Sequence, residues 1–433
     1  MRVLGIGARA DLGALYLALM REGHEVRVHA ADPAYAGAFA GLVHLVPDWR
    51  AELGWVGRDG VVLFEKVGQG VLQDQLRADG YRVVGGSALG DRLEYDRAFG
   101  QEVLREAGLN VARSNAFDSA AEAADWLAAH PGRFVLKHFD NARATFVGDH
   151  PAGADVLFQL QRRAVPGKRV LLMERLEGVE VGVGAYFNGQ RFLQPACIDF
   201  EHKRFFPGEI GEMTGEMGTL ASYEGAAPLF EAALAPLAPR LAAAGHVGYV
   251  NVNAIANEMG LWPLEFTCRF GNPGFAVLAV LQRDGWGDLL ERMTAGGSES
   301  FATHPGWSVG IVLTIPPFPA EDLAAAPGDD APVFFHADPV GADGAHYSLS
   351  DVRMTDGQLL ARRRTGYAMV VTGTGMDVRT AQARAVARAR NVVIPDLRWR
   401  ADIGDRFLTR DEARLRALGW LVPASRIQLA AGD

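Results

Sequence analysis

Three polar side chains interrupt an apolar run in the segment LEFTCRFGNPG, which covers residues 264–274. In a β-strand, residues two positions apart share a face, so Glu265, Thr267 and Arg269 are predicted to point the same way. A carboxylate, a hydroxyl and a guanidinium on one face suit a charged ligand. Spacing alone leaves a second interpretation open, a structural ion pair between Glu265 and Arg269.

An asparagine on the preceding strand extends this polar group. The runs GYVNVNAIAN and LWPLEFTCRF are joined by the turn-like residues 258–260, which predicts a hairpin with Asn253 and Glu265 on adjacent strands. Carboxylate and amide oxygens are the ligands that Mg²⁺ accepts beside bridging phosphates. The pair therefore indicates a metal site next to a phosphate.

A nucleotide site is indicated by residues further upstream. Lys137 ends the strand-like run FVLK, where a lone lysine is most often a surface residue. In MERLEGVEV, however, Glu174 and Glu180 flank a glycine turn between two predicted strands. A lysine for the phosphates, backbone groups for a purine and a carboxylate for ribose hydroxyls together make a nucleotide cleft.

The first strand ends in glycines, which suggests a different cofactor. Gly5-Ile-Gly7-Ala-Arg-Ala10 matches a loose dinucleotide fingerprint, and Asp32 closes the second predicted strand, where a ribose-binding acid would lie. Tight glycine turns after a first parallel strand occur in many α/β folds. The alternatives are a nicotinamide site, a turn that contacts the substrate, or a turn required by packing alone.

The elements that must position these residues fall into successive regions. Apolar runs alternate with amphipathic stretches up to Asn110, which predicts parallel strands with crossover helices. The runs FVLKHF, ATFVGD, RVLLMERL and VEVGVGAYF then follow closely and predict an antiparallel sheet with a helix or two, as a separate lid. An alanine-rich packing helix and the hairpin come next. From about Ser308 the pattern is again β-rich, with a basic helix near residues 380–391.

Composition narrows the function classes. The chain of 433 residues is 49% hydrophobic and 22% charged, which is typical of a globular protein, and its net charge of −9 argues against general nucleic-acid binding. Two cysteines are too few for a disulfide framework and suit a reducing cytoplasm. Arg9 and Asp11 interrupt the apolar opening, so no targeting signal or membrane span is predicted.

The segment LEFTCRFGNP closely resembles the VIEFNCRFGDPE-type motif of phosphoribosylamine–glycine ligases, members of the ATP-grasp superfamily. The resemblance runs nearly end to end: LEYDRAF is similar to the family's LEGSKAF, MERLEGVEV to its adenine hinge, and FEHKR with TGEMG to its DHKR and TGGMG. It implies an α/β ATP-grasp fold in four parts: a Rossmann-like N-terminal domain over 1–110, an α+β lid over 111–190, a central catalytic domain over 191–305 and a β-rich C-terminal domain over 306–433.

Carried over position by position, the resemblance implies roles for sixteen residues. Lys203 and Arg269 would act in catalysis, with Arg269 stabilising an acyl-phosphate or its flanking carboxylate. Lys137 and Arg97 would bind ATP phosphates, Glu174, Arg175 and Leu176 would form the adenine hinge, and Glu180 would bind the ribose. Glu265, Asn253 and Thr267 would hold the metal, and Gly7, Arg9, Gly215, Glu216 and Asn272 would contact substrates.

Several positions depart from the family pattern. Thr267 stands where the family has a metal-binding asparagine. The segment HFDNARATF replaces a glycine-rich lid loop, with Arg143 near the expected phosphates. GARADLG and the proline-rich Ile315–Pro319 replace the two glycine-rich segments associated with the sugar phosphate, and proline has no N–H to donate to a phosphate. We therefore predict an amine substrate other than phosphoribosylamine.

The predicted function is an ATP-dependent ligase that joins a small carboxylic acid to an amine through an acyl-phosphate, using ATP with Mg²⁺ or Mn²⁺. Its partners would be small molecules rather than nucleic acid or membrane, and the protein would be a cytoplasmic monomer or homodimer. Three alternatives stay open. One is the phosphoribosylamine–glycine ligase of purine biosynthesis, one is a catalytically silent nucleotide-binding protein, and one is a nicotinamide oxidoreductase.

Overall fold

The computed structural model describes residues 1–138, 141–162, 168–322, 324 and 327–422, and side chains within 138–144 are outside the description. The prediction for Arg143 therefore lies outside the described residues. In the described part, no helix combines the length and the apolar character needed to cross a membrane.

The N-terminal region is a parallel sheet of five strands, as the alternating pattern predicted. Its order is β3-β2-β1-β4-β5. The strands are β1 (Arg2–Gly7), β2 (Glu25–Ala30), β3 (His44–Leu45), β4 (Val61–Phe64) and β5 (Arg82–Val84). Helices α1 (Gly13–Arg21), α2 (Leu53–Val56) and α3 (Gly70–Ala78) connect them, followed by α4 (Ala88–Tyr95) and α5 (Arg97–Glu106). The carboxyl ends of β1 and β4 lie side by side, so residues just after Gly7 and Phe64 meet at one edge.

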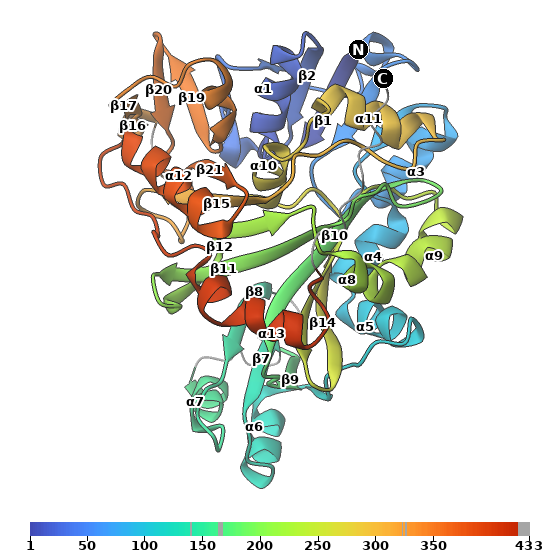
Figure 1. The fold of residues 1–433 in the computed structure, drawn as a ribbon, viewed down its shortest axis with the longest axis vertical. Helices are drawn as coiled ribbons and strands as arrows, with labels where there is room; N and C mark the ends of the chain where they lie inside the picture. The colour runs from blue at the N-terminus through green and yellow to red at the C-terminus, as the bar shows by residue number, and fades with distance from the viewer. Residues whose placement is uncertain (139–140, 163–167, 323, 325–326, 423–433) are drawn as a thin grey trace.

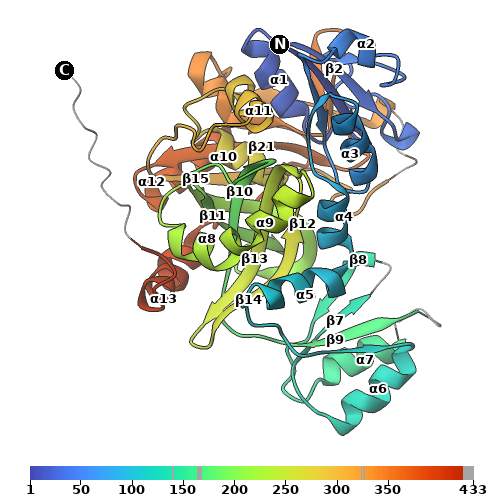
Figure 2. The ribbon, with the colours of Figure 1, turned by 90° about the vertical axis from the view of Figure 1, so that its right-hand side faces the viewer.

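A small antiparallel sheet projects from one end of the molecule (Figures 1 and 2). It has the order β6-β9-β7-β8, with β6 (Ser114–Phe117), β7 (Phe134–His138), β8 (Asn141–Val147) and β9 (Val170–Glu174). Helices α6 (Ala120–Ala129) and α7 (Ala154–Arg162) pack on this sheet around a small apolar core that includes Leu127, Leu136 and Leu172. This is the sheet with helices that the sequence predicted as a lid.

The largest sheet has eight strands and joins regions that the sequence analysis kept apart. Its order is β14-β13-β10-β11-β12-β15-β21-β18. The strands are β10 (Val179–Asn188), β11 (Cys197–Phe206), β12 (Ile210–Ser222), β13 (Val247–Asn257), β14 (Gly260–Thr267), β15 (Trp307–Thr314), β18 (Tyr347–Leu349) and β21 (Tyr367–Gly375). All pairings between these strands are antiparallel.

Two expectations about strand partners are therefore wrong. The run VEVGVGAYF, predicted to belong to the lid sheet, is β10 and pairs with β11 and β13. The late strands β15, β18 and β21, predicted to belong to a separate C-terminal domain, continue the central sheet beyond β12. Both errors have one cause, because strand patterning identifies a strand but does not identify the strand it will pair with.

Helices cover both faces of the central sheet (Figure 1). Two apolar cores result, one that includes α8 and α12 residues and one that joins α1, α10 and α11 to the sheet. The helices are α8 (Ala227–Ala233), α9 (Ala238–Ala243), α10 (Gly274–Ala279), α11 (Trp286–Ala295), α12 (Val378–Asn391) and α13 (Glu412–Ala417). The short strands β16 (Ala331–Pro332), β17 (Phe334–Phe335), β19 (Val352–Thr355), β20 (Gln358–Ala361) and β22 (Val392–Val393) complete the C-terminal region.

Candidate active site

Charged and polar residues line one face of four neighbouring strands in the central sheet. Asn253 on β13 lies directly opposite Glu265 on β14 and opposite Gly182 on β10, so the predicted hairpin pairing is confirmed. Gly182 in turn lies opposite Asp199 of β11. Because alternate residues of a strand share a face, Glu180 extends the row on β10, and Glu201 and Lys203 extend it on β11.

Lys203 is the centre of this polar face. Its Nζ lies 2.8 Å from Glu201 Oε2, 3.4 Å from Glu180 Oε1 and 3.5 Å from Glu265 Oε1. Burial opposes the charged form of Lys203, but these three carboxylates raise its pKa well above the ordinary value. Asn253 Nδ2 donates to Glu180 Oε1 at 3.1 Å and to Glu201 Oε2 at 3.3 Å. The arrangement fixes three carboxylates around one ammonium group.

Two further cations approach this group from other elements. Arg97, at the start of α5, has its guanidinium 3.7 Å from Glu265 Oε2. Lys137, on β7 of the projecting sheet, has its pKa lowered to about 8, chiefly by burial and then by the neighbouring Arg97 charge. Burial raises the pKa of Glu265, but the charges of Lys203, Arg97 and Lys137 outweigh it and lower this pKa. Three cations from three elements therefore surround one carboxylate, which is a setting for phosphate groups.

Acidic residues that the sequence analysis did not single out lie beside this group. Asp199 accepts a hydrogen bond of 2.7 Å from Asn251 Nδ2, and burial followed by the charge of Glu201 raises the pKa of Asp199 to about 7. Glu201 itself contacts Lys203. The segment CIDFEHKR contained the signal, since its alternation places Asp199, Glu201 and Lys203 on one face of a strand.

Arg269 lies beyond the end of β14 and outside the ionic group around Lys203. Strand β14 ends at Thr267, so the prediction that Glu265, Thr267 and Arg269 share one strand face does not extend to Arg269. The Arg269 guanidinium lies 3.3 Å from Glu94 Oε1 on α4, and Glu94 also accepts from the Cys268 N–H at 2.7 Å. The alternative of a Glu265–Arg269 ion pair is therefore wrong. Thr267 lies opposite Asn251 on β13.

The predicted adenine-hinge residues are connected to the projecting sheet rather than to the Lys203 group. Glu174 ends β9, and its N–H donates to the Arg113 carbonyl. The Arg175 guanidinium donates to the Gly148 carbonyl at 2.8 Å and to Asp149 Oδ1 at 2.5 Å. Leu176 follows as a half-buried residue. The Arg175 side chain is therefore bound to the residues that follow β8.

The glycine turn after β1 is filled by a carboxyl group. A Cβ at Gly7 would overlap the Glu65 side chain, which follows β4 and is 1% exposed. Glu65 accepts from Tyr16 Oη at 2.8 Å and from the Asp11 N–H at 3.1 Å. Burial, followed by the charge of Asp11, raises the pKa of Glu65 to about 7. The space that an anion would need beside this turn therefore holds an acidic side chain.

The remaining predicted substrate residues are spread around this turn and the sheet. Arg9 Nη1 donates to Glu321 Oε1 at 2.9 Å, and its guanidinium lies 3.9 Å from the centre of the Tyr35 ring. Asn272 and Gly215 are exposed, whereas Glu216 is buried. Asp32, considered for a ribose, accepts from the Ala34 N–H at 2.9 Å and caps the 3₁₀ helix Pro33–Tyr35.

The donor set at Glu265 and Asn253 fits Mg²⁺, since both supply oxygen ligands from directly opposed strand positions. Within the described ranges, no three His, Cys, Asp or Glu side chains are grouped so as to hold a metal ion by themselves. A magnesium ion here would therefore complete its shell with phosphate oxygens and water.

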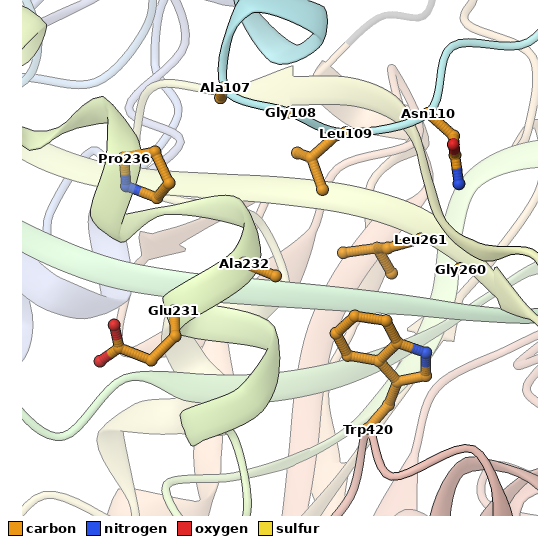
Figure 3. A pocket seen from close by; sticks show the side chains of 10 residues that line it. All are labelled: Ala107, Gly108, Leu109, Asn110, Glu231, Ala232, Pro236, Gly260, Leu261 and Trp420. Carbon is orange, nitrogen blue, oxygen red and sulfur yellow. The ribbon is translucent and has the colours of Figure 1, made fainter.

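A separate surface cavity of about 360 Å³ lies between α5, α8 and β14. Figure 3 shows its lining, with Leu109, Leu261 and Trp420 around it and the Glu231 carboxylate directed away from Trp420. None of the sixteen predicted site residues lines this cavity, so it is distinct from the polar face.

Comparison with known proteins agrees with this geometry. The family model for the phosphoribosylglycinamide synthetase ATP-grasp (A) domain matches residues 95–275. The phosphoribosylamine–glycine ligase of Neisseria meningitidis serogroup B is 25% identical over 361 residues, covering 78% of this chain and 81% of that protein.

Two solved structures share the architecture. The phosphoribosylamine–glycine ligase of Thermotoga maritima superposes with a TM-score of 0.70 at 19% identity, covering 93% of this chain and all of that one. A biotin carboxylase domain from Hydrogenobacter thermophilus, solved in complex with MgADP, has a TM-score of 0.63 at 11% identity and covers 96% of this chain and 97% of its own.

The sheet order therefore corresponds to the ATP-grasp fold, and residues 95–275 match an ATP-grasp domain model. Over most of its length, the chain is similar to the phosphoribosylamine–glycine ligases.

Proposed function

We propose that the protein is an ATP-dependent carboxylate–amine ligase that forms an amide through an acyl-phosphate. The observation that carries this proposal is the convergence of Lys137, Arg97 and Lys203 on Glu265, because a phosphoryl group needs several cations around it. The carboxylates beside Lys203 distinguish this arrangement from a simple anion site, since they suit a metal-bound nucleotide.

In the proposed reaction, an oxygen of the substrate carboxylate attacks the γ-phosphorus of ATP, and the bond from phosphorus to the bridging oxygen breaks to release ADP. The amine nitrogen then attacks the acyl carbon, the phosphate leaves, and the nitrogen loses a proton. Lys137 and Arg97 offset the charge that develops on the transferring phosphoryl group. Lys203 keeps Glu180, Glu201 and Glu265 close together, so these carboxylates are already in place when the nucleotide binds.

Mg²⁺ held by Glu265 and Asn253 would supply positive charge to the phosphate oxygens. The residue roles named for the hinge, the ribose and the metal form part of this proposal. Arg269, which lies against Glu94, would contact the acid substrate or its acyl-phosphate from the edge of the site.

The amine of this proposal is not phosphoribosylamine. The phosphate of a sugar phosphate needs N–H groups or cations that converge on one anion. Here, Glu65 fills the turn at Gly7, and Arg9 is paired with Glu321, which follows the proline-rich segment 315–319. A carboxyl group in the turn would repel a phosphate and exclude it by volume.

The test measures products. Purified protein is incubated with ATP, Mg²⁺ and pooled amino acids and amines, and ADP, phosphate and new masses are followed. We expect ADP and phosphate, at a rate that falls about a hundredfold in Glu265→Gln. Glu102→Gln is the control, because Glu102 is an exposed residue that pairs with Arg105.

Three outcomes would contradict the proposal in different ways. Release of AMP and pyrophosphate would rule out the acyl-phosphate route. Tight nucleotide binding without turnover in any pool would favour a silent nucleotide-binding protein. Efficient formation of glycinamide ribonucleotide from glycine and freshly generated phosphoribosylamine would show that the amine is the one used in purine biosynthesis.

A further inference from the structure

Glu216 is a buried acid with one carboxyl oxygen that receives no hydrogen bond from the described residues. It is 8% exposed, and within the described residues its Oε1 has no hydrogen-bond donor in reach. An isolated buried carboxylate is costly, because the ion loses water without gaining a compensating charge. Consistent with this, burial and then the charges of Glu201 and Asp199 raise the pKa of Glu216 well above its usual range.

The position of Glu216 follows from an irregularity in strand pairing. Strands β11 and β12 pair regularly down to His202 opposite Gly218, and pairing resumes in a shifted register at Arg204 opposite Met213. Glu216 lies in the shifted stretch of β12, across from Lys203 of β11. The charged neighbours of its carboxyl group include Glu201, Asp199 and Lys203.

A second unpartnered oxygen belongs to Tyr367, which packs beside the strand segment that carries Glu216. Tyr367 packs with Met217 and Phe318, and its ring centre lies 5.8 Å from that of Phe318. The Tyr367 Oη is buried and has no hydrogen-bond partner in the described residues. Met217 is the chain neighbour of Glu216, so this packing brings Tyr367 close to the Glu216 segment. After burial, the charges of Glu216 and Asp11 raise the pKa of Tyr367.

This part of the site carries more acidic than basic side chains. The acids are Asp11, Glu65, Glu216 and Glu321, and the cations near them are Lys66, Arg9 and Lys203. Lys66 pairs with Asp11 at 2.6 Å and Arg9 pairs with Glu321 at 2.9 Å. Lys203 is shared among Glu180, Glu201 and Glu265, so each of the three cations is already paired with another acid. A ligand that completes this region must supply both positive charge and hydrogen-bond donors.

We propose that Glu216 and Tyr367 bind a second ammonium group of the acceptor amine, so that the acceptor is a diamine or another amine with an additional cationic group. The assignment to the acceptor rests on the proposed ligase function and on the association of the segment GARADLG, which contains Gly7 and Asp11, with the amine substrate. An ammonium group donates three hydrogen bonds and matches a carboxylate and a phenol oxygen that both lack donors. One nitrogen of the acceptor would then be held while the other attacks the acyl carbon.

The test is a binding measurement that needs no turnover. Isothermal titration of the full-length protein with Mg·ADP present compares 1,4-diaminobutane with 1-aminobutane, which lacks the second nitrogen. We expect the diamine to bind at least about tenfold more tightly, because a buried polar site discriminates strongly against a ligand that leaves it unpaired. Glu216→Gln and Tyr367→Phe should each reduce that preference to below about threefold.

The controls separate this inference from simple loss of structure and from the ligase proposal. Glu212→Gln, an exposed glutamate on the same strand, should keep the full preference for the diamine. Tyr367→Phe retains the ring that packs on Phe318, so it remains informative if Glu216→Gln fails to fold.

Equal affinity of the wild-type protein for both amines would overturn the inference, and so would an unchanged preference in both variants. A parallel comparison of β-alanine with propionate tests the acid substrate instead. If Glu216 produced a preference only for β-alanine over propionate, the ammonium group would belong to the acid substrate. That result would contradict our assignment to the amine. A diamine preference without ADP formation would reject the ligase function and leave the Glu216 site standing.

Discussion

Lys203 shows how one residue can hold a site that would otherwise repel itself. Glu180, Glu201 and Glu265 lie on three different strands, and each contacts the same ammonium group. Without it, three carboxylates on one face would repel one another. The lysine charge holds the three carboxylates together and, with Arg97 and Lys137, lowers the pKa of Glu265.

Lys137 is in the opposite situation, because burial and the charges of Arg97 and Lys203 disfavour its charge in the free protein. Its pKa falls from 10.5 to about 8, so below pH 8 the folded protein bears the full cost of a buried ammonium group. We therefore predict that Lys137→Met raises the free energy of unfolding by about 1–3 kcal/mol at pH 7 while it lowers ATP turnover.

Because folding lowers the pKa of Lys137, the stability gain from Lys137→Met depends on pH. Between pH 8 and 10.5 the unfolded chain binds more protons at Lys137 than the folded chain, so wild-type stability rises with pH in this window. The increase in the free energy of unfolding caused by Lys137→Met should therefore decrease toward pH 10.5. Urea denaturation at a series of pH values measures it, and the exposed Lys168→Met is the control. A variant less stable than wild type at pH 7 would contradict the argument.

The sequence predicted much of this site because its key residues lie in short local patterns. Lys137, Glu180 and Glu265 were identified from strand ends and from a motif resemblance, and the structure brings them together around Lys203. The Asn253–Glu265 pairing followed from hairpin geometry. Glu65 could not be predicted, because it reaches the Gly7 turn from a strand more than fifty residues away, and no local pattern encodes that contact.

At the scale of elements, glycines in strand β10 leave space for large side chains from the neighbouring strands to lie across it. Gly182 and Gly184 lie on the polar face of this strand. A Cβ at Gly182 would overlap the Asp199 carboxylate, and one at Gly184 would overlap the Tyr249 hydroxyl. Both neighbours are buried and hydrogen-bonded, Asp199 to Asn251 and Tyr249 to Cys197. The glycines therefore provide the space in which the polar layer is packed.

We predict that Gly184→Ala destabilises the protein by about 1–3 kcal/mol, because the added methyl group must displace a buried tyrosine. Gly215→Ala is the matched control, since nothing lies within 4 Å of a Cβ built there. Its free energy of unfolding should change by no more than about 0.5 kcal/mol. Guanidinium denaturation compares the two, and equal values for both variants would refute the packing argument.

The elements themselves were easier to predict than their neighbours. Alternating apolar and amphipathic stretches identified the parallel N-terminal sheet, and four close strands identified the region of the projecting sheet. The placement of β10 failed because its sequence, rich in valine and glycine, fits either sheet equally well. Its true partners, β11 and β13, are chosen by long-range contacts such as Gly182 with Asp199 and Asn253.

At the scale of the whole molecule, the two cysteines lie in the apolar cores on opposite faces of the central sheet. Cys197 belongs to the core shared with α1 and α11, and Cys268 to the core shared with α8 and α12. Both are fully buried, and burial raises the pKa of Cys197 to about 12 and that of Cys268 well above the ordinary value. Thiolate formation and access to reagent therefore both require opening of the fold.

We predict that a disulfide reagent such as 5,5′-dithiobis(2-nitrobenzoate) labels neither thiol in the native protein on the timescale of minutes and labels both after unfolding. Mg·ADP should slow labelling in mild urea, because a ligand that binds only the folded state lowers the open population. Absorbance of the released anion and peptide mass analysis assign the sites. Rapid native labelling of either cysteine would show that its core is open in solution.

The continuous central sheet has a consequence for how the chain can be divided. Strand β15 pairs with β12 from Ser308 to Ile311, so a fragment that ends at residue 305 would leave that side of β12 without a partner. An unprotected strand edge is a template for other chains, and such a fragment would self-associate by edge-to-edge pairing rather than persist as a monomer. The strands after residue 306 therefore cover the edge of β12, and we expect that the chain cannot be divided at that boundary into parts that fold separately.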